Sequence, residues 1–116
     1  MRRNQRIGRW GEEAAAEYLS SRGFVILERN HRTPYGEIDL VTRKDGQTVL
    51  VEVKTRTSKS LGPPEISVGA RKRAHMIACA EHYAQGNALA HWRIDVIAVE
   101  KIAGEIRIRH FENAVG

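Results

Sequence analysis

The stretch that decides the fold runs from Gly36 to Thr55 and reads GEIDLVTRKDGQTVLVEVKT. Acidic and aliphatic side chains alternate over residues 37–41, and polar and aliphatic side chains alternate again over 48–55. A two-residue period of this kind predicts half-buried β-strands. Asp45-Gly46 lies between the two segments and is a strong signal for the tight turn of a hairpin. We therefore expect the two strands to pair as an antiparallel hairpin.

Helical and extended segments are predicted on both sides of this hairpin, with glycine and proline marking their ends. The other expected segments are a helix at 5–22, a strand at 24–27, a loop at 29–36, a loop at 56–64, a helix at 65–85 and strands at 92–99 and 105–111. The order α-β-β-β-α-β-β, with a helix between two of the strands, predicts an α/β fold built on a mixed sheet flanked by helices.

Composition narrows the class of protein before any motif is considered. A chain of 116 residues suits one domain, expected at 1–116. Cys79 is the only cysteine, which excludes a disulfide within the chain and favours a reducing cytoplasm. The apolar runs are too short for a membrane span, and the basic N-terminus lacks the apolar run of a signal peptide. The net charge of +5 favours a polyanionic partner such as nucleic acid, although it also serves solubility.

The positions of the acids on the central hairpin point to chemistry. Glu37 and Asp39 share one strand face, and Glu52 and Lys54 share a face of the next strand. Pairing of the two strands would bring three carboxylates and a lysine together. Acids among aliphatic residues need a partner, and Mg²⁺ or Mn²⁺ is one that accepts carboxylate oxygens. This set fits metal-assisted hydrolysis of a phosphodiester, whereas the alternative is a solvated face of surface ion pairs.

A longer pattern of residues resembles a known family. Asp39 followed by Glu52-Val53-Lys54 looks like the PD-(D/E)XK nuclease signature. The motifs of the longer pattern are Gly8-x-x-Gly11-Glu12, Asn30-x-Arg32, Gly36-Glu37-Ile38-Asp39-Leu40, Val51-Glu52-Val53-Lys54-Thr55-Arg56 and Arg93-x-Asp95. The pattern extends from Gly8 to Asn113 and is similar to the YraN-like bacterial family, which is related to archaeal Holliday-junction resolvases. Ile38 departs from the superfamily, which often has proline before the first acid.

The resemblance implies a restriction-endonuclease-like core and assigns roles to individual residues. Asp39 and Glu52 would be metal ligands, with the Val53 carbonyl as a third, and Lys54 would be the catalytic lysine. Glu12 would match an acid on the first helix that approaches the metal, and helical spacing favours Glu12 over its neighbour Glu13. Glu37 is a secondary acid, because it shares the face of Asp39.

Basic residues on either side of these acids are candidates for binding phosphates. The candidates are Arg29, Arg32, Arg56, Lys59 and Lys72, the last of them favoured by the resemblance. The expected partner is DNA, branched or otherwise structured, and the sequence does not separate DNA from RNA. Resolvase-like relatives act as two-fold dimers, so the resemblance implies a homodimer.

Three hypotheses about function follow from the sequence. The first is a Mg²⁺-dependent endonuclease acting on DNA. The second is a nucleic-acid-binding module that keeps the fold with little or no cleavage. The third is an interaction protein whose basic charge serves solubility, and a flat salt response of DNA binding would favour it over the other two.

Overall fold

The computed structural model of the chain describes residues 3–57 and 69–115. The helices are α1 (Arg3–Ser21) and α2 (Ala70–Gly86), and the strands are β1 (Val25–Thr33), β2 (Gly36–Lys44), β3 (Gln47–Thr57), β4 (Trp92–Ile102) and β5 (Glu105–Val115). This confirms the predicted order α-β-β-β-α-β-β and the α/β fold class.

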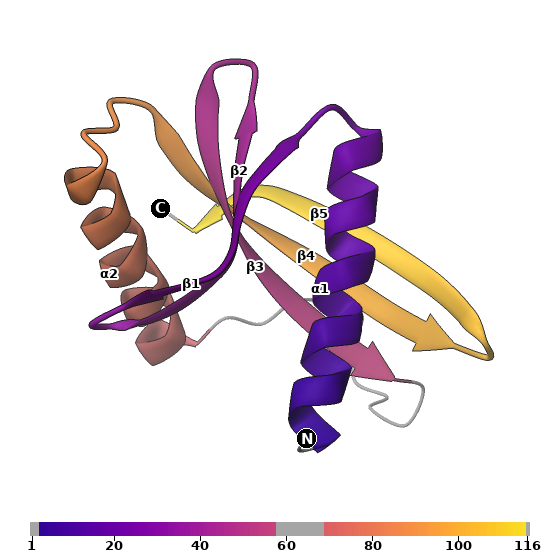
Figure 1. Cartoon of the computed structure of the whole chain (residues 1–116). Coiled ribbons are helices and arrows are strands. Elements are labelled where there is room, and N and C mark those ends of the chain that lie inside the picture. Colours follow the sequence, from indigo (N-terminus) through magenta and orange to yellow (C-terminus); the bar gives the residue numbers. More distant parts are fainter. Residues whose placement is uncertain (1–2, 58–68, 116) are drawn as a thin grey trace.

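The five strands found in these residues form one mixed sheet whose spatial order, β1-β2-β3-β4-β5, follows the chain (Figure 1). β3 and β4 are parallel, and the other neighbouring pairs are antiparallel. The parallel pair requires a crossover, and α2 lies within it. The predicted hairpin of β2 and β3 is confirmed, with Lys44 opposite Gln47 and Leu40 opposite Val51.

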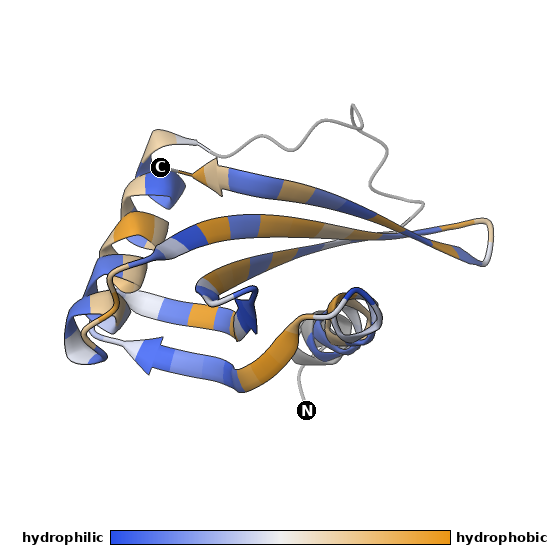
Figure 2. Cartoon of the chain, turned by 90° about the horizontal axis from the view of Figure 1, so that it is seen from above, coloured by the Kyte–Doolittle hydropathy of each residue, from blue (hydrophilic) through white to orange (hydrophobic). Residues whose placement is uncertain are grey.

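The core has two parts, because side chains of the central strands alternate between the two faces of the sheet. Figure 2 shows hydrophobic and hydrophilic residues following one another along the strands. Val49 and Val51 of β3 belong to the part that includes Leu19 of α1. Leu50, between them in the chain, belongs to the part that includes Met76 of α2. The two helices therefore cover different faces, and the α2 face of β3 carries Leu50, Glu52 and Lys54.

The loop predicted at 29–36 is wrong, because β1 continues through most of it to Thr33. Arg32 lies opposite Glu37 and His31 lies opposite Ile38, so the polar residues of this segment form one side of a hairpin. The register shifts between Ile26 and Glu28, where β1 has an irregularity. Sequence patterns miss such a strand because it lies at the sheet edge, where exposed polar side chains are tolerated.

Other boundaries also differ from the prediction. α2 begins at Ala70 and the preceding Gly69 is extended, so the helix expected from residue 65 is too long at its start. Arg56 lies on β3 and not in a loop. Residues 58–68 lie outside the described part of the chain, and Lys59 is one of them. No helix of the described residues is both long and apolar enough to cross a membrane.

Gly11 sets how closely α1 approaches the sheet beside the acids. It is buried, and a Cβ at this position would overlap the Thr55 hydroxyl of β3. The absence of a side chain thus allows the helix backbone to lie directly against β3. Glu12, the next residue, is positioned by this contact.

We expect the substitution Gly11→Ala to destabilise the fold by about 1–3 kcal/mol, because an added methyl group overpacks the contact with Thr55. Urea unfolding measures the loss. Gly86→Ala, in α2, is the matched control, because an added Cβ there meets nothing within 4 Å. Equal stability of the two variants would contradict this account of Gly11.

Candidate metal and nuclease site

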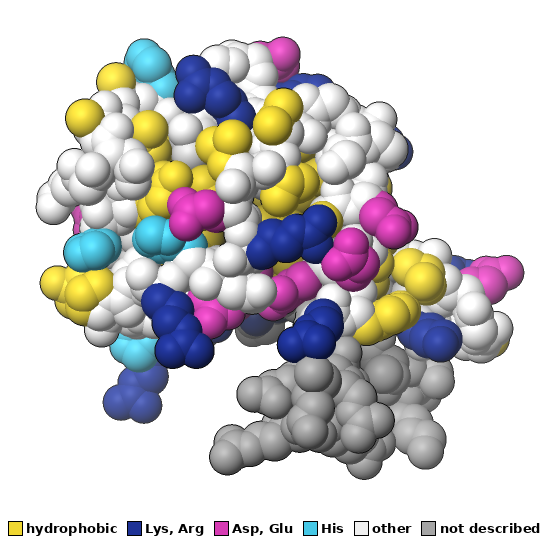
Figure 3. Space-filling model, in the orientation of Figure 1, with side chains coloured by type: hydrophobic (Ala, Val, Ile, Leu, Met, Phe, Trp, Pro, Cys, Tyr) yellow, Lys and Arg dark blue, Asp and Glu magenta, His cyan; other side chains and the backbone are white. Residues whose placement is uncertain are grey.

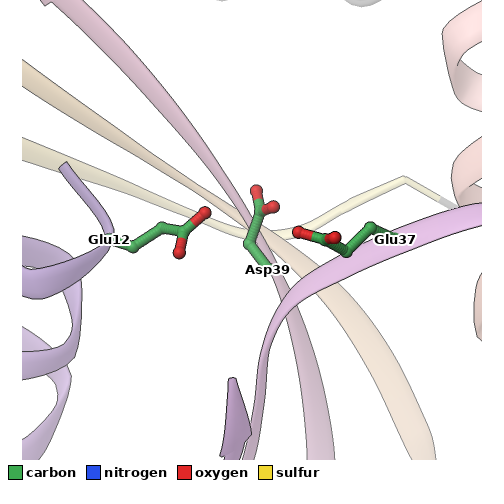
Figure 4. Close-up of side chains that lie close together, drawn as sticks. All are labelled: Glu12, Glu37 and Asp39. Carbon is green, nitrogen blue, oxygen red and sulfur yellow. The ribbon is translucent and has the colours of Figure 1, made fainter. Parts of the chain in front are cut away.

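Three carboxylates meet where β2 begins and α1 passes over it. Glu12 of α1 and Glu37 and Asp39 of β2 each offer one oxygen atom, and these atoms lie within 4.8 Å of one another (Figure 4). Glu12 and Asp39 are partly buried, whereas Glu37 is exposed. As helical spacing predicts, Glu12 lies toward Asp39, while Glu13 is exposed and pairs with Arg29. We call Glu12, Glu37 and Asp39 the acid cluster.

Asn30 holds two members of the acid cluster in place. Its side-chain amide nitrogen donates hydrogen bonds to Glu12 Oε1 at 2.8 Å and to Glu37 Oε1 at 3.0 Å. Its backbone has a positive φ of 52°, a conformation that asparagine adopts more readily than most residues. The sequence alone does not reveal this role of Asn30. Its only signal there is its place in the motif Asn30-x-Arg32.

Asp39 lies at the point where the backbone pairing of β2 with β3 ends. The paired register stops at Leu40 and Val51, and Asp39 Oδ2 then accepts the backbone N–H of Val53 at 2.7 Å. The N–H and C=O of one residue in a strand point to the same side. The Val53 carbonyl therefore also points to the β2 side of β3, which is compatible with its predicted role as a ligand.

Glu52 approaches Asp39 from β3 and is held by Lys72 of α2. The Glu52 side chain is 14% exposed, and Lys72 Nζ lies 2.9 Å from its Oε1. The hydrogen bond from Lys72 to Glu52 raises the pKa of the lysine, which remains protonated. Lys54 is half-buried and shares the sheet face of Glu52.

Crowding of carboxylates makes Asp39 unusual. Burial, followed by the charge of Glu52, raises the pKa of Asp39 from 3.8 to about 8, and the charge of Glu12 adds to the shift. The hydrogen bond from the Val53 backbone N–H lowers the pKa of Asp39, but by less than the other effects raise it. A carboxylate that is costly to ionise next to other carboxylates is one that a cation would stabilise. The donor set of hard carboxylate oxygens fits Mg²⁺ or Mn²⁺.

The predicted phosphate-binding residues are spread around this centre and do not form one group. Arg32 is exposed opposite Glu37, and Lys72 contacts Glu52. Arg29 lies 2.8 Å from Glu13, and Arg56 lies 4.0 Å from Glu100. Arg56 follows Glu52 by four residues on β3, which corresponds to about 13 Å along the strand. Figure 3 shows acidic side chains across the middle of one face with lysine and arginine side chains among them.

The raised pKa of Asp39 predicts how stability depends on pH in the absence of divalent ions. Because the folded pKa lies above that of the unfolded chain, stability falls as pH rises from about 4 to about 8. Asp39→Asn removes this penalty and keeps an oxygen for Val53 N–H. We expect it to stabilise the protein by roughly 2–4 kcal/mol at about pH 8.5 and to have little effect at about pH 4.

Urea unfolding at both pH values, in a chelator, measures this difference. Glu105→Gln, an exposed acid at the start of β5, is the control and should change stability at neither pH. An equal effect of Asp39→Asn at both pH values would show that Asp39 ionises normally in the folded chain.

The fold and the site define a class of protein. It is an α/β protein with a mixed sheet, in which carboxylates gather where the pairing of two neighbouring strands ends. The profile of the uncharacterised protein family UPF0102 matches residues 11–99. The UPF0102 protein of Syntrophotalea carbinolica is 44% identical over 110 residues, covering 93% of this chain and 89% of its own. The UPF0102 protein of Syntrophomonas wolfei is 43% identical over 113 residues, covering 96% and 98%. The chain therefore belongs to the UPF0102 family.

Proposed function

We propose that this protein is a metal-dependent endonuclease that hydrolyses phosphodiester bonds in DNA. The observation that carries the proposal is the acid cluster beside Glu52, with the high pKa of Asp39 that results from burial and neighbouring carboxylates. Perturbed carboxylates of this kind are more common at functional sites than elsewhere. The resemblance to the PD-(D/E)XK signature assigns Asp39 and Glu52 of this group as metal ligands and adds Lys54 as the catalytic lysine.

Each residue of the site has a role that its position supports. Glu12, Asp39 and Glu52 would hold Mg²⁺ or Mn²⁺ through carboxylate oxygens, with the Val53 carbonyl as a further ligand and Glu37 as a secondary acid. The bound ion supplies Lewis-acid polarisation of a phosphoryl oxygen. Lys54 would position the attacking water or neutralise the charge that develops on the phosphate in the transition state.

Binding of the substrate backbone falls to the basic residues outside the acid cluster. Arg32 is the best placed on the β1–β2 side, because it is exposed opposite Glu37. Lys72 lies on the α2 side, at Glu52. Phosphate contacts of this kind fix the position of a strand without reading its sequence. We therefore expect cleavage that depends on the shape of the substrate more than on its sequence.

A second candidate function is a nucleic-acid-binding module that does not cleave. The ion pair between Lys72 and Glu52 favours it, because an ammonium group already lies on a carboxylate that the nuclease needs as a ligand. For the nuclease, Lys72 has to leave Glu52 when a cation binds, and the exposure of half its side chain permits this.

One experiment separates these functions. Purified protein with Mg²⁺ or Mn²⁺ is incubated with labelled linear duplex, single-stranded, flap and four-way DNA, and both binding and cleavage are measured. We expect metal-dependent cleavage of at least one substrate, lost in Asp39→Asn. Salt-dependent binding of all substrates without cleavage would favour the module. Absence of binding at low salt would contradict both functions.

A further inference from the structure

Tyr35 is an exposed aromatic side chain at the tip of the β1–β2 hairpin, two residues before Glu37 of the acid cluster. It is 55% exposed, and the other large apolar side chains exposed to this degree in the described residues are Val25, Leu27 and Ile106, all aliphatic. Exposure of a tyrosine ring leaves an apolar surface in water that could bind another planar group. Two features of its surroundings indicate what that group is.

The first feature is that the hairpin tip is fixed against α2 (Figure 1). Thr33 Oγ1 accepts the backbone N–H of Tyr35 at 3.1 Å and lies 2.8 Å from the Gly36 carbonyl oxygen. The same hydroxyl lies 3.3 Å from Cys79 Sγ of α2. The ring of Tyr35 meets the ring of His82 with centroids 6.0 Å apart and planes at 69°, an edge-to-face contact. The Tyr35 ring is thus held in place by α2 while more than half of it is exposed, which makes it a pre-organised binding surface.

The second feature is the distance from the acids. Tyr35 lies in the turn before β2, two residues before Glu37 and four before Asp39, so its backbone lies at most about 7 Å from the first and about 14 Å from the second. Arg32, across the hairpin from Glu37, is exposed on the same part of the surface. A nucleic-acid strand with a phosphate at the acid cluster would therefore have a neighbouring base within reach of the Tyr35 ring.

We propose that Tyr35 is a stacking platform for an unpaired base adjacent to the scissile phosphate. The proposal rests on the proposed function and narrows it, since it names the substrate class: nucleic acid with unpaired nucleotides at the cleavage point, such as a flap or a branch. Bases inside a duplex are already stacked and cannot offer a face to a protein ring, whereas unpaired bases stack readily on aromatic side chains. His82 of α2 supports the ring through the edge-to-face contact.

Binding of two DNAs by Tyr35→Ala tests the proposal, with Ca²⁺ present to prevent turnover. One DNA carries a single-stranded flap and the other is a fully paired duplex of equal length. Stacking on one aromatic side chain is worth roughly 1–3 kcal/mol per base. We expect flap binding to weaken roughly 5- to 150-fold, with duplex binding changed less than about two-fold. Tyr35→Phe, which keeps the ring, should bind both DNAs like the wild type.

A fluorescent base gives a direct readout. 2-Aminopurine placed in the flap next to the junction should be quenched on binding to the wild type and to Tyr35→Phe, and not on binding to Tyr35→Ala. Ile106→Ala removes another large apolar side chain of similar exposure, 50%, at the start of β5 and is the control. Equal weakening of flap and duplex binding in Tyr35→Ala, or the same effect in Ile106→Ala, would overturn the proposal.

Cleavage and flap binding together distinguish a failure of the stacking platform from a failure of the nuclease proposal. Acid-dependent cleavage with no selective effect of Tyr35→Ala would leave the nuclease and remove the stacking platform. Selective flap binding through Tyr35 without cleavage would keep the platform on a binding module. Absence of DNA binding by the wild type would overturn both.

Discussion

Lys54→Ala and Glu52→Gln are each expected to lower the rate of DNA cleavage by roughly 10²–10³-fold, while the protein stays folded. Glu52 lies beside Asp39, and Lys54 follows two residues later on the same face of β3, about 7 Å along the strand. Lys54→Ala takes away an interaction with charge that develops in the transition state, and Glu52→Gln takes away a carboxylate ligand of the cation that would polarise the phosphate. Substrate binding should therefore change much less than the cleavage rate.

Single-turnover cleavage, with binding measured separately, tests this prediction. Lys101→Ala is the control for Lys54→Ala, since Lys101 is exposed on β4 and on the other face of the sheet. Glu105→Gln is the control for Glu52→Gln. Both controls should cleave like the wild type. Cleavage that persists unchanged in Lys54→Ala and Glu52→Gln would point to a contaminating nuclease and remove the site assignment.

Asp95→Ala is expected to have the largest effect on stability, a loss of about 3–5 kcal/mol. Asp95 is fully buried on β4, and its carboxylate accepts hydrogen bonds from Arg93 at 2.9 and 3.1 Å and from Asn113 N–H at 2.9 Å. His110 Nε2 lies 2.7 Å away, and its other ring nitrogen lies 3.4 Å from the Tyr18 hydroxyl of α1. The carboxylate therefore ties β4 to β5 and, through His110, to α1.

Removing the carboxylate leaves an imidazole and a backbone N–H without their acceptor in a buried place, and the Arg93 guanidinium keeps Gln47 and Glu112 but loses its buried partner. Guanidinium chloride unfolding measures the loss. Glu112→Ala is the matched control, because Glu112 is a second partner of Arg93 at 3.1 Å but its side chain is 63% exposed. We expect that control to cost less than about 1 kcal/mol. Similar losses in the two variants would contradict a structural role for the buried carboxylate.

The features that the sequence predicts correctly are local. Alternation and the Asp45-Gly46 turn give the β2–β3 hairpin, and with it the nearness of Asp39 and Glu52. Helical spacing alone selects Glu12 over Glu13. Arg93 and Asp95 form an ion pair for a local reason as well, because residues two apart share one face of β4.

The features that the sequence does not reveal depend on contacts between distant elements. The bridge from Asn30 to Glu12 and Glu37 requires a left-handed residue in β1 and the close approach of α1. The ion pair of Lys72 with Glu52 requires the start of α2 to pack against the sheet beside Glu52 of β3. The partners of Asp95 on β5 follow from strand order, which local patterns do not fix.

Titration calorimetry of Mn²⁺ into the wild type and into Asp39→Asn is the most direct test of the central claim, that the acids around Asp39 hold a divalent cation. Because a bound cation needs the carboxylate ionised, the wild type should bind Mn²⁺ with release of protons below about pH 8. Asp39→Asn should bind at least about ten-fold more weakly and release fewer protons. Equal binding and equal proton release in the two proteins would contradict the account.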